Sequence, residues 1–215
     1  MTITLYDYFR SSACYRVRIA LNLKGLAYET VETSLLAGDH QLGSYKAMNP
    51  QGFVPMLTVD GVRLTQSLAI IEWLDTIYPE PRFIPADPTL RAHNMAMALT
   101  IACDIHPINN LRVLKRLGKI GVAETVRDDW YRHWISEGFT ALEAMADAAN
   151  PFLGGDAPGI ADILLVPQMA NARRFNTPLD DFPTLMRIDA ACSVIDAFAR
   201  AHPDAVKPPV VLADG

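Results

Sequence analysis

A proline-rich segment divides this chain into two parts that differ in their periodicity. Residues 79–88 read Pro-Glu-Pro-Arg-Phe-Ile-Pro-Ala-Asp-Pro. Because proline lacks a backbone N–H and fixes φ, such a run interrupts helices and strands and is typical of a linker. Short β-prone runs alternate with helical ones before it, whereas strand signals nearly vanish after it. The sequence therefore predicts two domains, residues 1–80 and residues 88–215.

The first part has the order strand–helix–strand, then strand–strand–helix. Strands are predicted at residues 2–6, 27–33, 55–59 and 62–65, a first helix from Ser11 or Ser12 to Lys24, a last one from Ser67 to Tyr78, and an irregular stretch at 35–52. The first strand–helix–strand run is short enough for a right-handed crossover, which predicts parallel pairing. The Asp60-Gly61 pair between the last two strands is a strong hairpin signal.

The second part is predicted to be helical. Helices are expected over residues 89–117, 124–149, 160–175 and 184–200, with a loose tail at 203–215. Pro107 removes an N–H from the first of these helices, so a kink is expected there. Asp162 lies at the start of a buried apolar run and is expected to cap its helix rather than to act in catalysis. The fold class is thus an α/β domain followed by an all-α domain.

Composition excludes several kinds of partner. The net charge is −5 and no basic run appears, which argues against nucleic acid as a partner. No apolar run approaches the ~18 residues that span a bilayer. The three cysteines, Cys14, Cys103 and Cys192, lie far apart without metal-ligand spacing, which favours a reducing compartment. We expect a cytoplasmic protein with no membrane segment and no bound metal.

The segment before the first long helix is the first candidate site. Arg10, Ser11 and Ser12 lie between a strand and a helix N-terminus, where N–H groups and the positive end of the helix dipole stabilise a thiolate. The serines have two interpretations, as helix caps or as catalytic hydroxyls. Cys14 resembles a nucleophile but falls inside the helix, so a buried structural cysteine is the favoured interpretation.

Two further pairs of residues could contribute to a site. Gln66-Ser67 at the start of a helix could bind a carboxylate through a hydroxyl and N–H groups, or Ser67 could simply cap the helix. Val54-Pro55 precedes a strand. Since few X-Pro bonds in folded proteins are cis, the sequence alone favours the trans form there.

Taken together, these motifs resemble a known family. The segments that carry the likeness are Ser11-Ser-Ala-Cys-Tyr-Arg-Val-Arg-Ile-Ala-Leu21, Asn49-Pro50, Val54-Pro55, Gln66-Ser-Leu-Ala-Ile-Ile-Glu72, Cys103-Asp-Ile-His-Pro-Ile-Asn-Asn110, Ala161-Asp162, Pro167-Gln168 and Asn171-Ala-Arg-Arg-Phe175. The chain resembles zeta-class glutathione transferases, which include maleylacetoacetate and maleylpyruvate isomerases. The likeness extends to about residue 200.

The resemblance implies a fold and a cofactor. It implies the glutathione transferase fold, in which a thioredoxin-like N-terminal domain binds glutathione and a helical domain supplies much of the substrate pocket, and it implies a homodimer. In this family the proline at position 55 is cis, so that the Val54 backbone faces the cysteinyl part of glutathione. Gln66 and Ser67 would hold the γ-glutamyl group. His40 would be a polar contact to glutathione, or a solvated loop residue.

The implied reaction is cis–trans isomerisation of a dianionic diketo acid, in which glutathione acts as the nucleophile. Ser11 and Ser12 would activate its thiol. Arg10 and Arg174 would bind a carboxylate or enolate, because the guanidinium fork suits carboxylates. Arg173 would face solvent.

The same resemblance implies that polar residues of the second domain line the substrate pocket. His106, Asn109 and Asn110 could line the pocket, with His106 near the reacting atoms and Asn110 on the substrate, or they could form an interhelical hydrogen-bond cluster. Some maleylpyruvate-type relatives carry an arginine where this chain has Leu111, which favours maleylacetoacetate as the substrate. Glutathione conjugation or dehalogenation of small electrophiles, and non-enzymatic glutathione binding, are the alternatives.

Overall fold

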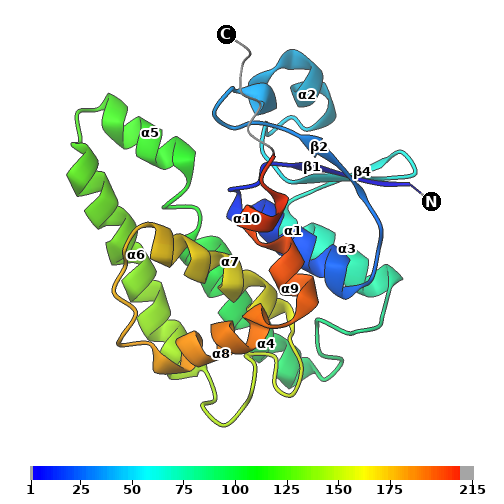
Figure 1. Ribbon diagram of the computed structural model, residues 1–215, viewed down its shortest axis with the longest axis vertical. Helices are drawn as coiled ribbons and strands as arrows, with labels where there is room; N and C mark the ends of the chain where they lie inside the picture. Colours follow the sequence, from blue (N-terminus) through cyan, green and yellow to red (C-terminus); the bar gives the residue numbers. More distant parts are fainter. Residues whose placement is uncertain (1, 209–215) are drawn as a thin grey trace. The chain divides into compact units, whose positions relative to one another are not determined.

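A computed structural model describes residues 2–208 of the chain (Figure 1). They form two compact units: one contains the described residues of Met1–Pro81 and Ile195–Gly215, and the other is Arg82–Val194. The boundary near residue 81 agrees with the proline-rich linker. The grouping of residues after 195 with the first unit differs from the domain range expected from the sequence, and its cause is given below.

The first unit is built on a four-stranded sheet. Its strands are β1 (Ile3–Asp7), β2 (Glu29–Glu32), β3 (Met56–Val59) and β4 (Val62–Thr65), in the order β2-β1-β3-β4. β1 pairs with β2 in parallel, and the other two pairs are antiparallel. At the β3–β4 hairpin, Asp60 and Gly61 have φ of 47° and 88°, as the favoured two-residue turn requires. The predicted strands, hairpin and parallel crossover are confirmed.

Helices α1 (Ser12–Leu23) and α3 (Ser67–Ile77) lie where the sequence predicts them. Their buried residues, Val17, Ile19, Leu21, Ile70, Ile71 and Leu74, pack with Ile3, Leu5 and Leu57 of the sheet as the core. The stretch expected to be irregular contains two short elements, η1 (Asp39–Gln41) and α2 (Gly43–Met48). Each is too short to produce a clear periodic pattern, which is why the sequence did not predict it.

The end of the described chain returns to the first unit. α9 (Asp196–Ala201) lies against α1, where the Asn22 side-chain amide donates to the Ala197 carbonyl at 2.9 Å. α10 (Pro203–Val206) follows it, so the predicted loose tail begins with a helical turn. The rest of that prediction, residues 209–215, lies outside the described residues. These contacts explain why the residues after 195 group with the first unit.

The second unit is helical. Its elements are α4 (Pro88–Leu99), η2 (Thr100–Ile105), α5 (Leu111–Lys119), α6 (Glu124–Met145), α7 (Ile160–Arg174) and α8 (Pro183–Ser193). The continuous helix expected over 89–117 is wrong: it widens into the π-helical turn η2, where the His106 N–H donates to the Ile101 carbonyl, and then ends. Because Pro107 has no N–H to continue the ladder, the chain breaks and restarts at α5 rather than kinking.

α7 is the most deeply buried helix of this unit, and Asp162 fixes its start. The Asp162 carboxylate accepts from the N–H groups of Leu153 (2.8 Å), Gly154 (2.9 Å) and Gly159 (2.8 Å). Gly159 is the N-cap. Asp162 is therefore a structural cap, as predicted. Across the described residues, no helix combines the length and apolar character needed to cross a membrane.

We predict that Asp162→Ala lowers the free energy of unfolding by about 3 kcal/mol, because it leaves buried N–H groups without an acceptor. Urea unfolding followed by tryptophan fluorescence measures the loss. Asp156→Ala is the matched control, since Asp156 is an exposed carboxylate in the same loop, and it should change stability by less than about 0.5 kcal/mol. Equal effects of the two substitutions would contradict the capping role.

Candidate active site

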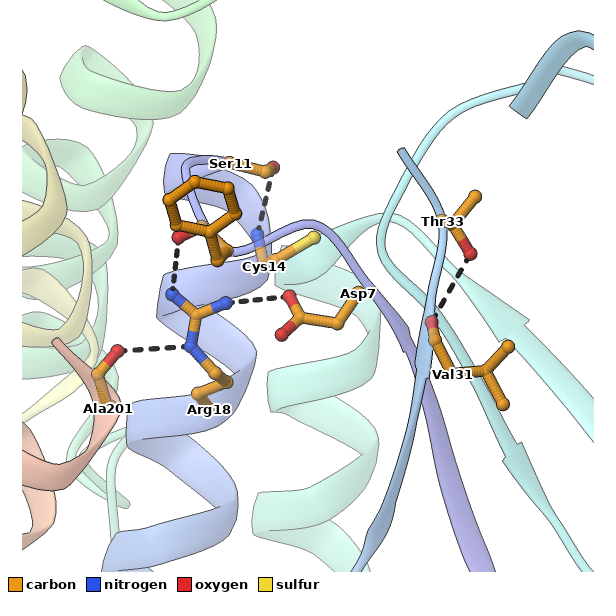
Figure 2. Close-up of polar contacts among 8 residues, drawn as sticks. Asp7, Ser11, Cys14, Arg18, Val31, Thr33 and Ala201 are labelled. Carbon is orange, nitrogen blue, oxygen red and sulfur yellow. Dashed lines mark hydrogen bonds and ion pairs between the residues drawn. The ribbon is translucent and has the colours of Figure 1, made fainter. Parts of the chain in front are cut away.

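The N-terminus of α1 is organised by Ser11. The Ser11 N–H donates to the Tyr8 carbonyl at 2.8 Å, which closes a turn between β1 and α1. The Ser11 hydroxyl oxygen then accepts from the Cys14 N–H at 3.2 Å, as an N-cap does (Figure 2). A hydroxyl that accepts through oxygen still has its own proton to donate. Capping and thiol activation are therefore compatible at Ser11.

The neighbours of Ser11 differ in exposure. Ser12 is buried at 8% relative exposure and is the first residue of α1. Arg10 is exposed, and its guanidinium carbon lies 5.2 Å from the centroid of the Phe9 ring. A ring face at this distance from a cation is attractive and helps to keep the guanidinium beside the turn.

Cys14 lies beneath this turn, fully buried in a cluster with Tyr8, Tyr45, Val54 and Met56. Burial raises the pKa of the Cys14 thiol, and the Asp7 carboxylate raises it further. A thiol in this state is a poor nucleophile. The interpretation of Cys14 as a buried structural cysteine is confirmed.

The segment before β3 contains the Val54–Pro55 peptide bond, which is cis. The trans form favoured by the sequence alone is wrong, and the cis form implied by the family resemblance is confirmed. The preceding carbonyl, that of Phe53, accepts from the Tyr45 hydroxyl at 2.6 Å and from the Asn49 side-chain amide at 2.7 Å. These two bonds fix the backbone that leads into Val54.

The start of α3 places polar groups over a buried cation. Ser67 is the first residue of α3, and its hydroxyl accepts from Nη1 of the buried Arg16 at 3.4 Å. Ser67 is thus not the N-cap, because Gln66 occupies that position. Gln66 has φ of +70°, unusual for a residue with a side chain, and donates to Gln51 at 2.8 Å. The sequence did not assign Arg16, although a charge among the apolar residues of α1 was the available signal.

His40 lies in η1 and is half-buried. Its Nδ1 is buried, and within the described part of the chain no hydrogen bond to it is found. Its carbonyl packs against Gly52, where an added Cβ would lie 2.9 Å from that oxygen. The side chain is thus partly enclosed by its loop.

In the helical unit, Arg174 is exposed at the end of α7, with its guanidinium carbon 5.0 Å from the Phe175 ring centroid. Phe175 stacks on Tyr131 with ring centroids 3.7 Å apart. Burial raises the pKa of Tyr131, and Arg174 partly offsets that rise. Arg173 is exposed as expected, and it forms an ion pair with Asp189 at 2.5 Å. The sequence analysis did not single out Tyr131.

Two of the polar residues that follow Pro107 form hydrogen bonds within the helical unit. The buried Asn109 side-chain amide donates to the Tyr131 carbonyl at 3.1 Å. The Asn110 side-chain oxygen accepts from the Arg112 N–H at 3.1 Å and so caps α5. The Asn109 bond agrees with the interhelical hydrogen-bond interpretation, whereas the Asn110 bond is a local cap of α5. His106 is half-buried.

An open surface depression of about 470 Å³ lies in the helical unit, lined by Cys103, Asp104, Pro107, Ile108, Val113 and Trp134. Neither His106 nor Arg174 is among its lining residues. The sequence-predicted substrate residues of this unit are therefore not gathered around this depression.

Comparisons with known proteins agree with this architecture. Residues 5–82 match the family described as Glutathione S-transferase, N-terminal domain. The maleylacetoacetate isomerase of Rhizobium meliloti (strain 1021) is 50% identical over 95% of this chain and 97% of its own length.

Solved structures are similar over nearly the whole chain. The holo structure of maleyl pyruvate isomerase, described as a bacterial glutathione S-transferase of the zeta class, has a TM-score of 0.91 and 44% identity, covering 94% of this chain and 97% of that one. The maleylacetoacetate isomerase of Anaeromyxobacter dehalogenans 2CP-1, with bound dicarboxyethyl glutathione and citrate, has a TM-score of 0.86 and 42% identity, covering 97% and 98%.

The mixed sheet, the cis proline ahead of β3 and the helical unit define a glutathione transferase fold. Within that class, the chain belongs to the zeta-class family of maleylacetoacetate and maleylpyruvate isomerases.

We predict that iodoacetamide modifies the exposed Cys103 of the native protein and leaves the buried Cys14 and Cys192 unmodified until the chain unfolds. Buried thiols are both inaccessible and protonated, so their rates should be at least about 100-fold lower. Peptide mass spectrometry after native and urea-denatured labelling makes the comparison. Native modification of Cys14 at the rate of Cys103 would contradict the burial described here.

Proposed function

We propose that this protein is a glutathione-dependent cis–trans isomerase of maleyl-type diketo acids, with maleylacetoacetate as its substrate. The observation that carries the proposal is the Ser11 hydroxyl, which caps α1 through its oxygen and retains a proton to donate. A relative named maleylacetoacetate isomerase, 50% identical over nearly the full length, supports it.

The residues of the first unit fit glutathione by their chemistry. The tripeptide has a thiol, a peptide backbone and a γ-glutamyl group with a carboxylate and an amine. Ser11 would hold the thiol, the Val54 backbone the cysteinyl residue, and Gln66 and Ser67 the γ-glutamyl group. The buried Arg16 guanidinium that donates to Ser67 makes this end of α3 favourable for an anion. His40, which is half-buried in η1, would be a further polar contact for the tripeptide.

Bound glutathione supplies a thiolate that adds reversibly to the activated cis double bond, so that the carbon–carbon bond can rotate. The protein lowers the pKa of the thiol through the Ser11 hydroxyl and the N-terminal N–H groups of α1, with Ser12 beside it. Arg10 and Arg174 bind the substrate carboxylates and stabilise charge that develops on the substrate oxygens. We assign His106 and Asn110 to the substrate side as well.

A second candidate is maleylpyruvate isomerase activity. The TM-score of 0.91 to a maleyl pyruvate isomerase favours it, whereas Leu111 beside the asparagine pair favours maleylacetoacetate. Both substrates present the same chemistry to Ser11 and the arginines. We further propose a cytoplasmic homodimer, supported by the exposed apolar side chains of Val62 on β4 and Ile77 on α3.

We predict that Ser11 substitutions separate helix capping from catalysis. Ser11→Asp keeps a capping oxygen but places a negative charge beside the thiolate, so stability should stay within about 0.5 kcal/mol of wild type. Glutathione-dependent conversion of maleylacetone or maleylpyruvate should still fall about 100-fold. Ser11→Ala should lose both, with about 1 kcal/mol less stability.

Thermal unfolding and isomer conversion, each with and without glutathione, are the two measurements. Wild-type activity in a stable Ser11→Asp protein would contradict a catalytic Ser11. Conversion that needs no glutathione, or no conversion beside rapid conjugation of small halides, would overturn the isomerase proposal itself.

We predict that Arg174→Ala lowers kcat/KM for the diketo acid by about 100-fold, because a charge-assisted contact to a carboxylate is lost. Glutathione binding, measured by calorimetry, should change less than about threefold. The matched control is Arg187→Ala, which removes an exposed arginine that donates to the Ala148 and Asn150 carbonyls, and it should leave both quantities near wild type. Parallel losses of glutathione binding and turnover would argue against a substrate role for Arg174.

A further inference from the structure

Arg18 is a fully buried cation whose guanidinium joins three separate segments of the first unit (Figure 2). Its Nη1 donates to Asp7 at the end of β1 at 2.6 Å. Its Nη2 donates to the Phe9 carbonyl at 3.1 Å, and its Nε donates to the Ala201 carbonyl at the end of α9 at 3.0 Å. The planar fork thus fixes three acceptors that come from β1, the turn before α1, and α9.

Fold stability alone does not account for such a group. Burying two charges costs several kcal/mol each, and replacing a buried ion pair with apolar residues is often neutral or stabilising. The three-way geometry also needs arginine, because lysine presents a single point charge instead of a planar fork. We therefore expect a functional role of Arg18 in the three segments that its hydrogen bonds hold in place.

The Phe9 carbonyl belongs to the turn that delivers Ser11 to its capping position. That turn is closed by the Ser11 N–H bond to the Tyr8 carbonyl at 2.8 Å. In a planar trans peptide the carbonyl and the following N–H point in opposite directions. By holding the Phe9 carbonyl towards the interior, Arg18 directs the Arg10 N–H away from it and sets the path of the chain into Ser11.

Direct electrostatic action of Arg18 on a ligand at Ser11 is weakened by its ion pair with Asp7. The Arg18 side chain reaches back along α1 to the Phe9 carbonyl, so its positive charge and the negative charge of Asp7 both lie near the turn and offset each other. The neighbouring titratable groups include Asp7 on β1, Cys14 and Tyr15 on α1, and Tyr28 before β2; the Tyr15 ring centroid lies 5.4 Å from the guanidinium carbon. Burial raises the pKa of both Cys14 and Tyr28, which keeps both neutral, and Asp7 balances the charge of Arg18. Arg18 thus acts through the turn.

We propose that Arg18 is a positioning residue for the glutathione thiol: it holds the Phe9–Ser11 turn in the geometry that aims the Ser11 hydroxyl, and it ties this turn to α9 through Ala201. The inference rests on the proposed glutathione site. It adds a residue that contacts neither glutathione nor the substrate.

The test measures the ionisation of bound glutathione rather than turnover. Arg18→Lys keeps a cation for Asp7 and loses the fork, so we expect the pKa of the bound thiol, followed by thiolate ultraviolet absorbance, to rise by about one unit, a tenfold change. Glutathione affinity should change less than about threefold, and kcat should fall more than KM rises. Hydrogen exchange at the Arg10–Cys14 amides of the free protein should become about tenfold faster.

Lys24→Met is the matched control. Lys24 lies at the other end of α1, and its buried ammonium pairs with Asp75 at 2.8 Å and donates to the Pro81 carbonyl at 2.6 Å. The Lys24→Met substitution should reduce global stability without changing the pKa of the bound glutathione thiol. If Arg18→Lys does not fold, the double substitution Asp7→Leu with Arg18→Met removes both charges together and should raise the thiol pKa equally.

A wild-type thiol pKa in Arg18→Lys or in the double variant, or an equal shift in Lys24→Met, would overturn the inference. The two proposals fail in different ways. A wild-type protein that binds and ionises glutathione but converts no diketo acid would refute the isomerase function and leave the role of Arg18 standing. Full isomerase activity with an unchanged thiol pKa in Arg18→Lys would refute the role of Arg18 alone.

Discussion

The hydrogen bond from the Cys14 N–H to the Ser11 hydroxyl oxygen is the interaction on which the candidate site depends. It satisfies one of the donors that every helix start leaves open, and it fixes the direction in which the hydroxyl proton can point. The residue that makes α1 begin where it does is therefore also the residue that we propose meets the glutathione sulfur. Beneath it, the buried Cys14 contributes packing and no reactivity.

Two buried arginines of α1 stabilise the segments around this helix start. Arg16 donates to Ser67 at the start of α3, and Arg18 holds Asp7 and the Phe9 carbonyl. The chain is acidic overall, with a net charge of −5, so its general field does not attract an anion. The buried Arg16 and the helix N-termini supply positive potential locally instead, where a low dielectric strengthens it.

Features set by local sequence were predictable. The Asp60-Gly61 hairpin, the proline-rich linker, the Ser11 cap and the Asp162 cap depend on residues close together in the chain, and the structure has all four. Features set by tertiary contacts were not. The burial of Arg16 and Arg18 and the bond of Asn109 to the Tyr131 carbonyl depend on partners from other helices or strands. Sequence alone also gave the wrong isomer at Pro55, which only the family resemblance corrected.

The docking of α9 on α1 has a consequence for biosynthesis. The carbonyls of Ala197 and Ala201 follow their donors, Asn22 and Arg18, by 175 and 183 residues in the chain. Until synthesis has passed Ala201, the Arg18 fork lacks one of its three acceptors. The first unit therefore completes these hydrogen bonds only after the residues of the helical unit have been synthesised.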